Sequence, residues 1–163
     1  MAEYWNISPG LEAKAKAFLS AKPEADVNLD FEIGVKDFVN AGKGSAEVKN
    51  VLKRLGVDPV VLRRIAVASY EAEINVTAHS NGGIMHSYVY ADLVYIRFED
   101  KGPGIADIEQ AMVPGWSTAD ELVREMGFGA GLGLPNIQKN SDLLHIESVA
   151  GGSTTLEIII YYA

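Results

Sequence analysis

Two clusters of glycine residues are the part of the sequence best suited to chemistry. The first, Gly102-Pro103-Gly104, follows Asp100, and the second alternates glycine with other residues from Gly127 to Gly133, just before a predicted helix. Glycine lets a backbone approach a ligand closely, and free N–H groups at the start of a helix bind phosphate oxygens. The second cluster therefore predicts a phosphate cradle, with a flexible loop as the alternative.

A row of polar side chains on a predicted helix is the second candidate. Glu71, Asn75 and His79 are each four residues apart, so they lie in one line along a helix over residues 58–79. Beside this row, small and apolar residues repeat at the helical period and predict a buried face, namely Leu62, Ile65, Ala66, Ser69, Ala72 and Val76. Two interpretations stay open for the polar row: the edge of a site, or a solvated face without chemistry.

Other phosphate-binding motifs do not fit. Gly42-Lys43-Gly44-Ser45 lacks the upstream glycine and the spacing of a P-loop, and a leucine stands where the last glycine of a dinucleotide fingerprint would be. The H-R-D and D-F-G elements of protein kinases are absent. Any nucleotide site in this chain therefore needs another scaffold.

The elements that must position these residues fall into hairpins and separate helices. Strands are predicted over 28–35, 84–90, 93–99, 143–149 and 154–162, and helices over 11–21, 45–55, 58–79 and 135–140. Ser45 and Asp58 are the expected N-caps, and Gly56 the expected residue after a helix end. This order favours an α+β two-layer sandwich, with a mixed, mostly antiparallel sheet and helices on one face.

We divide the chain into an N-terminal extension, residues 1–27, and a domain over residues 28–163. The extension, with its predicted helix over residues 11–21, is either packed on the domain or a mobile arm. Neither interpretation assigns chemistry to it.

Composition excludes several function classes. The net charge is −8, and residues 82–163 carry 4 Lys and Arg against 11 Asp and Glu, so we expect no nucleic-acid partner. No cysteine is present, which excludes disulfides and thiolate metal sites. There is no secretory signal and no apolar run long enough to span a bilayer, so we expect no membrane partner and a cytoplasmic location.

Three motifs together resemble the boxes of the GHKL ATPases, which share the Bergerat ATP-binding fold. They are Glu71-x-x-x-Asn75, Asp100-x-Gly102-x-Gly104 and Gly129-x-Gly131-x-Gly133. Within that superfamily, the segments DKGPGIADIEQAMVPGWST, GAGLGLPNI and GGSTTLEI are similar to the RsbT-like branch of bacterial anti-sigma and switch serine kinases. The resemblance covers about residues 28–161 and leaves the N-terminal segment outside.

The resemblance implies ATP and Mg²⁺ as cofactors. Asp100 would accept a hydrogen bond from the adenine amino group, and Thr154 would support the adenine end through Asp100 or through a water. Gly102 and Gly104 would bring the backbone close to the base. Asn75 would ligate Mg²⁺ through its amide oxygen.

At the phosphate end, the resemblance implies that Gly129, Gly131 and Gly133 present backbone N–H groups and that Glu71 is the general base. Residues 106–126 would form a lid, with an apparent insertion, ADELVREMGF, relative to the short lids of the family. Arg124 would contact the γ-phosphate or be a plain surface arginine. For His79, a phosphate or metal contact and a structural role are equally open.

Three functions follow from this resemblance. The first is a serine/threonine kinase that phosphorylates a small STAS-type antagonist protein. The second is a nucleotide-gated module that binds a partner such as a sigma factor, and the third is a free-standing ATP hydrolase. A homodimer is left open, and Tyr88, Tyr90 and Tyr95 belong either to a partner surface or to sheet packing.

Overall fold

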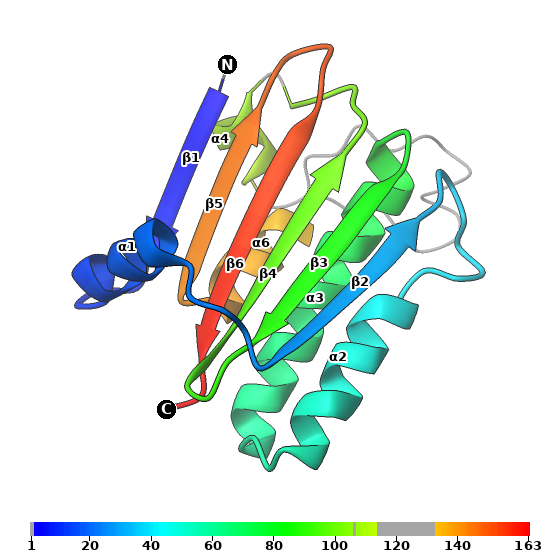
Figure 1. Cartoon of the computed structure of the whole chain (residues 1–163). Helices are drawn as coiled ribbons and strands as arrows, with labels where there is room; N and C mark the ends of the chain where they lie inside the picture. Colours follow the sequence, from blue (N-terminus) through cyan, green and yellow to red (C-terminus); the bar gives the residue numbers. More distant parts are fainter. Residues whose placement is uncertain (1, 106, 114–132) are drawn as a thin grey trace.

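A single six-stranded sheet organises the chain (Figure 1). The computed structural model describes residues 2–105, 107–113 and 133–163. The strands are β1 (Ala2–Ile7), β2 (Val27–Ile33), β3 (Gly83–Val89), β4 (Leu93–Asp100), β5 (Leu143–Ser148) and β6 (Thr154–Tyr161). The helices are α1 (Glu12–Ala21), α2 (Lys43–Arg54), α3 (Pro59–His79), α4 (Ile108–Ala111) and α6 (Gly133–Asn140). The strand order is β1-β5-β6-β4-β3-β2, and all five pairings are antiparallel.

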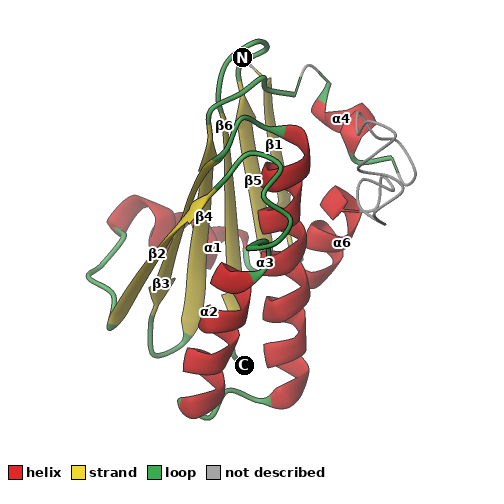
Figure 2. Ribbon diagram, turned by 90° about the vertical axis from the view of Figure 1, so that its right-hand side faces the viewer, coloured by secondary structure: helices red, strands yellow, loops and turns green. Residues whose placement is uncertain are grey.

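The main core lies between the sheet and three helices. Alternate residues of the central strands point to this side, so Val94, Ile96 and Phe98 of β4 line up with neighbours of the same kind on β6. Helix α3 meets them with its predicted apolar stripe, which includes the fully buried Ile65. Figure 2 shows α2, α3 and α6 together on this face. The predicted α+β two-layer sandwich is therefore confirmed, whereas the sheet is antiparallel in every described pairing and not mixed as predicted.

Helix α1 lies on the opposite face of the sheet, where the prediction had no helix. Its Ala15 and Phe18 pack on a second hydrophobic cluster (Figure 1). On the strands, this cluster includes Tyr95, Leu143 and Ile159, whose side chains point away from the main core. Tyr95 is 3% exposed there, so sheet packing explains this tyrosine. We call the face that carries α1 the outer face of the sheet.

Strand β1 is an element that the sequence analysis missed. It pairs with β5 at the edge of the sheet, and the hydroxyl of its Tyr4 donates to Gln138 on α6. Its six residues do not alternate regularly between apolar and polar side chains, because Tyr4 and Trp5 are adjacent, so the periodic signal is weak. Of the two alternatives for the N-terminal segment, the structure has residues 2–21 packed on the sheet. The domain boundary at residue 28 stays a prediction.

The predicted ends of α3 are confirmed. Asp58 accepts a hydrogen bond from the N–H of Val60 at 2.9 Å, Pro59 occupies the first helical position, and the helix ends at His79. Gly56 directly follows the C-cap residue of α2 and has a φ of 83°, as expected of a glycine at that position. Within the described residues, no helix is both long enough and apolar enough to cross a membrane.

The start of α2 corrects a prediction. The helix begins at Lys43 rather than after Ser45, and its first N–H groups are capped from another helix. The buried carboxylate of Glu73 on α3 accepts from the N–H groups of Gly42, Gly44 and Ser45 at 2.9, 3.3 and 2.9 Å. A carboxylate at a helix N-terminus satisfies donors that the helix cannot satisfy itself. Glu73 therefore ties α2 to α3.

Replacing Glu73 by alanine tests this tie. Because three backbone N–H groups, two of them buried, lose their acceptor, we expect the free energy of unfolding to fall by about 2–4 kcal/mol in urea denaturation. The control is Glu47→Ala on the exposed side of α2, expected to change it by no more than about 0.5 kcal/mol. Equal effects of the two variants would contradict a capping role.

Candidate functional site

Asp100, at the end of β4, is the best-anchored of the predicted site residues. Its Oδ1 accepts two backbone hydrogen bonds, from Gly102 N–H and from Thr154 N–H, both at 2.9 Å. Among the described residues, no hydrogen bond reaches Oδ2. One carboxylate oxygen thus holds the loop and β6 together. Burial raises the pKa of Asp100, and the two N–H donors oppose that rise.

Thr154 supports Asp100 through its backbone N–H and not through its side-chain hydroxyl. Its backbone N–H makes the contact, while its hydroxyl lies 2.7 Å from the hydroxyl of Ser148. Ser148 Oγ also accepts from the N–H of Ile105 at 2.6 Å. Ser148 was missed by the sequence analysis, because a serine at a strand end carries no specific signal. These bonds fix the glycine loop on the β5–β6 hairpin.

The glycines of the first cluster are required by the protein's own backbone. Gly102 and Gly104 have φ values of 102° and 83°. A Cβ atom at Gly102 would lie 2.7 Å from the carbonyl oxygen of Gly152, and one at Gly104 would lie 2.1 Å from that of Val149. The expectation was close approach to a base; the described contacts show close approach to the β5–β6 hairpin.

Backbone hydrogen bonds tie this loop to the end of α3. The N–H of Asn81 donates to the carbonyl of Gly102 at 2.8 Å, and the N–H of Lys101 donates to the carbonyl of Gly82 at 3.0 Å. The helix that carries the polar row and the loop that carries Asp100 are therefore held in one frame.

The polar row of α3 is half-buried rather than solvated. Glu71, Asn75 and His79 are each of intermediate exposure, and the residues between them on the helix are buried. This burial favours the edge of a site over a solvated face. Burial also raises the pKa of Glu71, because removing a carboxylate from water disfavours its charged form.

Glu71 lies beside the N-terminus of α6, the end of the second glycine cluster. A Cβ atom added at Gly133 would lie 3.5 Å from Glu71 Oε2. Helices α3 and α6 pack side by side (Figure 2). The structure thus brings Glu71 close to Gly133 and, separately, Asp100 close to Gly102 and Thr154.

Part of the predicted site lies outside the described residues. Gly129, Gly131 and Arg124 are among these, as is most of the predicted lid. Of the lid, residues 107–113 are described; they hold α4, whose N-cap Asp107 accepts from the N–H of Gln110 at 3.0 Å.

The described part of the site offers two kinds of chemistry. Asp100 presents a half-buried carboxylate that can accept from an amino group. The polar row adds a carboxylate with a raised pKa and, one turn on, an amide oxygen of the kind Mg²⁺ accepts.

A cleft of about 470 Å³ lies at the far end of the sheet, between the start of β2 and the α2–α3 turn. None of the predicted site residues lines it.

Comparison with known proteins identifies similar proteins both by sequence and by fold. No protein-family model matches the chain. The chain is 34% identical over 115 residues to the serine/threonine-protein kinase RsbT of Bacillus subtilis (strain 168), which covers 68% of this chain and 80% of that protein. Its fold is similar to a chain in the crystal structure of the SiaB–SiaC complex from Pseudomonas aeruginosa. The TM-score is 0.57 at 15% identity, over 92% of this chain and 98% of that one.

Alanine at Gly104 tests the packing of the glycine loop. The control is Gly151→Ala, since Gly151 also has a positive φ, 75°, but has open space where the Cβ would go. We expect Gly151→Ala to lower the free energy of unfolding by about 1–2 kcal/mol, the cost of the left-handed backbone alone. Gly104→Ala should cost at least about 1 kcal/mol more, because the Val149 carbonyl must move. Equal losses in urea denaturation would mean that the loop yields freely.

Proposed function

This chain belongs to the family of the serine/threonine-protein kinase RsbT, and we propose that it is itself a protein kinase of the GHKL type. In this proposal it binds ATP with Mg²⁺ and transfers the γ-phosphate to a serine or threonine of a partner protein.

The adenine end of the nucleotide is assigned to Asp100. Two N–H donors hold Oδ1 and thereby orient the carboxylate, so Oδ2 accepts from the adenine amino group. A buried hydrogen bond of this kind discriminates strongly against bases that lack the amino group, because the carboxylate would be left unpaired.

The phosphate end is assigned to the α3–α6 contact. The observation that carries the proposal is the position of Glu71 Oε2, 3.5 Å from the Cβ site of Gly133, where a helix N-terminus would receive phosphate oxygens. Asn75 would ligate Mg²⁺ here, and the metal would neutralise charge on the phosphates. Gly129 and Gly131 would add N–H donors, and Arg124 would contact the γ-phosphate.

Glu71 then acts as the general base. Its carboxylate takes the proton of the attacking hydroxyl, the hydroxyl oxygen bonds to the γ-phosphorus, and the bond from that phosphorus to the β,γ-bridging oxygen breaks to release ADP. Desolvation supports this role, because a raised pKa brings the carboxylate closer to the pKa that is best for proton transfer near neutral pH.

The phosphorylated partner is proposed to be a small STAS-type antagonist protein. RsbT is named a protein kinase, and the structure with the similar fold is a complex of two proteins. A nucleotide-gated module that binds a partner such as a sigma factor would need no base at the phosphate end. The half-buried carboxylate of Glu71 therefore favours the kinase.

Two variants separate nucleotide binding from phosphoryl transfer. Glu71→Gln should leave ATP affinity nearly unchanged and slow transfer to a STAS-type partner by ~10²–10⁴-fold, because only the base is lost. Asp100→Asn should weaken ATP binding at least tenfold, about 1.4 kcal/mol, because an amide nitrogen then faces the adenine amino group. Calorimetry with Mg²⁺ and transfer of labelled phosphate measure the two effects.

The matched controls are Glu47→Gln and Asp92→Asn, both exposed and away from the site. They should leave both measurements unchanged. Tight ATP binding with no transfer to any partner would favour the binding module. Slow phosphate release without a partner, lost in Glu71→Gln, would favour a hydrolase.

The raised pKa of Glu71 also predicts a pH-dependent stability. Folding shifts this pKa upward, so the folded state binds the proton more tightly, and the charged carboxylate costs stability at neutral pH. Glu71→Gln should therefore have a larger free energy of unfolding than the wild type at pH 7.5. The difference should shrink as the pH falls through the folded pKa and vanish below the ordinary glutamate value of 4.5. Urea denaturation at several pH values measures it, and a less stable variant at pH 7.5 would contradict the assignment.

A further inference from the structure

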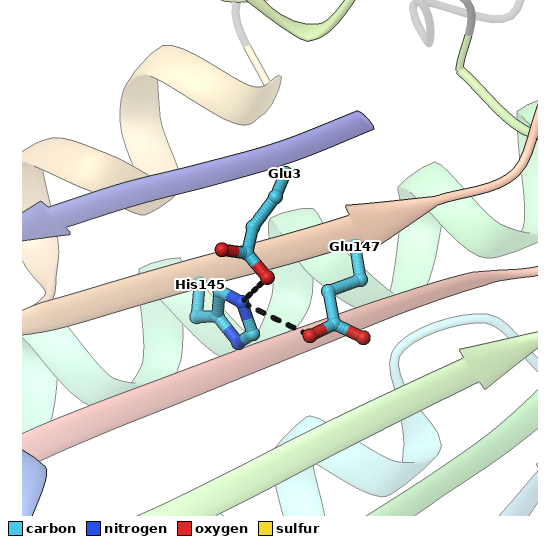
Figure 3. Close-up of side chains that lie close together, drawn as sticks. All are labelled: Glu3, His145 and Glu147. Atoms are coloured by element: carbon cyan, nitrogen blue, oxygen red, sulfur yellow. Dashed lines mark ion pairs between the residues drawn. The ribbon is translucent and has the colours of Figure 1, made fainter. Parts of the chain in front are cut away.

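Three side chains that the kinase site does not use converge on the outer face of the sheet. Glu3 of β1 stands opposite Glu147 of β5 in the strand register, and His145 lies two residues before Glu147 (Figure 3). Residues two apart on a strand share a face, so all three side chains point to the same side. Their nearest ligand atoms all lie within 4.8 Å of one another.

His145 is buried, and one of its ring nitrogens is aimed into this cluster. The residue is 5% exposed, and among the described residues its Nε2 has no hydrogen-bond partner. Nε2 lies 3.4 Å from Glu3 Oε2 and 3.5 Å from Glu147 Oε1 (Figure 3). Both distances exceed those of good hydrogen bonds between nitrogen and oxygen. A buried nitrogen placed between two carboxylates can take either a second ring proton or a metal ion.

The contact of the other ring nitrogen, Nδ1, explains how Nε2 can act as a metal ligand. Nδ1 lies 2.7 Å from Oε1 of the buried Glu157, whose Oε2 accepts from the hydroxyl of Tyr95. A carboxylate at Nδ1 holds a proton there, so a metal ion at Nε2 would displace only the second ring proton. Burial lowers the pKa of His145, but the surrounding carboxylates outweigh burial and raise that pKa, which favours the second proton. The indole of Trp5 stacks on the imidazole at 3.7 Å and fixes the ring plane. Metal-binding histidines in proteins are oriented by a carboxylate in the same way.

We propose that Glu3, His145 and Glu147 bind a divalent transition-metal ion of the zinc type. Zinc bonds of about 2.0–2.2 Å at tetrahedral angles place neighbouring ligand atoms about 3.3–3.5 Å apart. The two distances from Nε2 match that separation. The third edge, between the two carboxylates, closes by rotation of side chains that are 44% and 43% exposed. Water completes the fourth position.

Charge and ligand type decide which ion fits. Two carboxylates and a neutral imidazole balance a charge of +2. Imidazole suits zinc and its neighbours in the transition series, whereas Mg²⁺ and Ca²⁺ prefer oxygen ligands alone. The site is therefore distinct in chemistry from the Mg²⁺ site proposed at Asn75, and it does not depend on the kinase proposal.

An ion at this place would join β1 to β5. Glu3 is the ligand from the edge strand, and the two others belong to the strand beside it. The residue after Glu147 is Ser148, which points to the inner face and holds the glycine loop through Ile105. The ion would thus stabilise the edge next to the strand that supports the adenine end.

Zinc binding to the full chain, freed of metal and without nucleotide, tests the proposal. Titration calorimetry with Zn²⁺ should show one site per chain that Glu3→Gln and Glu147→Gln each weaken at least tenfold. Glu32→Gln is the matched control, since Glu32 is an exposed glutamate in the same row of the outer face on the far edge strand, β2. It should change the affinity less than twofold.

A spectroscopic readout on the wild type decides the matter without any variant. Zinc should shift the ¹⁵N resonance of His145 Nε2 and leave Nδ1 protonated toward Glu157. Absence of zinc uptake, uptake that both glutamine variants retain in full, or an unchanged Nε2 resonance in the zinc-loaded chain would each overturn the proposal.

Discussion

Two backbone N–H groups that donate to one carboxylate oxygen, Asp100 Oδ1, are the interaction on which the rest of the site depends. They come from two residues far apart in the sequence and on different elements, Gly102 and Thr154. Their shared acceptor fixes the glycine loop against the hairpin and orients the second oxygen of the carboxylate. Backbone hydrogen bonds also join the same loop to the turn that follows α3. The loop that carries Asp100 and the helix that carries the polar row are therefore held in fixed positions relative to each other.

Two glutamates on α3 illustrate how a structural carboxylate differs from the one proposed as the general base. Glu73 is 3% exposed and accepts three N–H donors, so its charge is satisfied inside the protein. Glu71, two residues earlier, is half-buried, and burial alone raises its pKa. A carboxylate without such compensation is held at a cost in stability, which is typical of groups that act on a ligand.

The sequence predicted the parts of the molecule that depend on local pattern. The hairpins, the N-cap of α3 and the alignment of Glu71, Asn75 and His79 in one row follow from periodicity and capping chemistry. The half-burial of that row does not, because the sequence pattern also left a solvated face open. It did not predict β1, whose pairing with β5 is contact between chain ends, nor the capping of α2 by Glu73, which joins two helices. Ser148 and the His145 cluster were missed for the same reason: each acts through partners that are distant in the sequence.

The first glycine cluster also depends on contacts between residues that are distant in the sequence. The pattern at Gly102 and Gly104 predicted that the backbone lies close to a ligand. In the structure, a side chain at either position would collide with a backbone carbonyl of the β5–β6 hairpin. One motif can thus be required by folding and still mark a site, because the packing it permits is what orients Asp100.

The central claim is that Asp100 and Glu71 act at opposite ends of one adenine nucleotide, and amide chemical shifts test it most directly. Adenosine, which has no phosphates, should shift the amide signals of Gly102 and Thr154 and leave those at the start of α6 unchanged. Mg²⁺ with ATP should add shifts at Gly133 and Leu134. Shifts confined to the far cleft around Tyr162, or no response of the Gly102 and Thr154 amides to either ligand, would contradict the account.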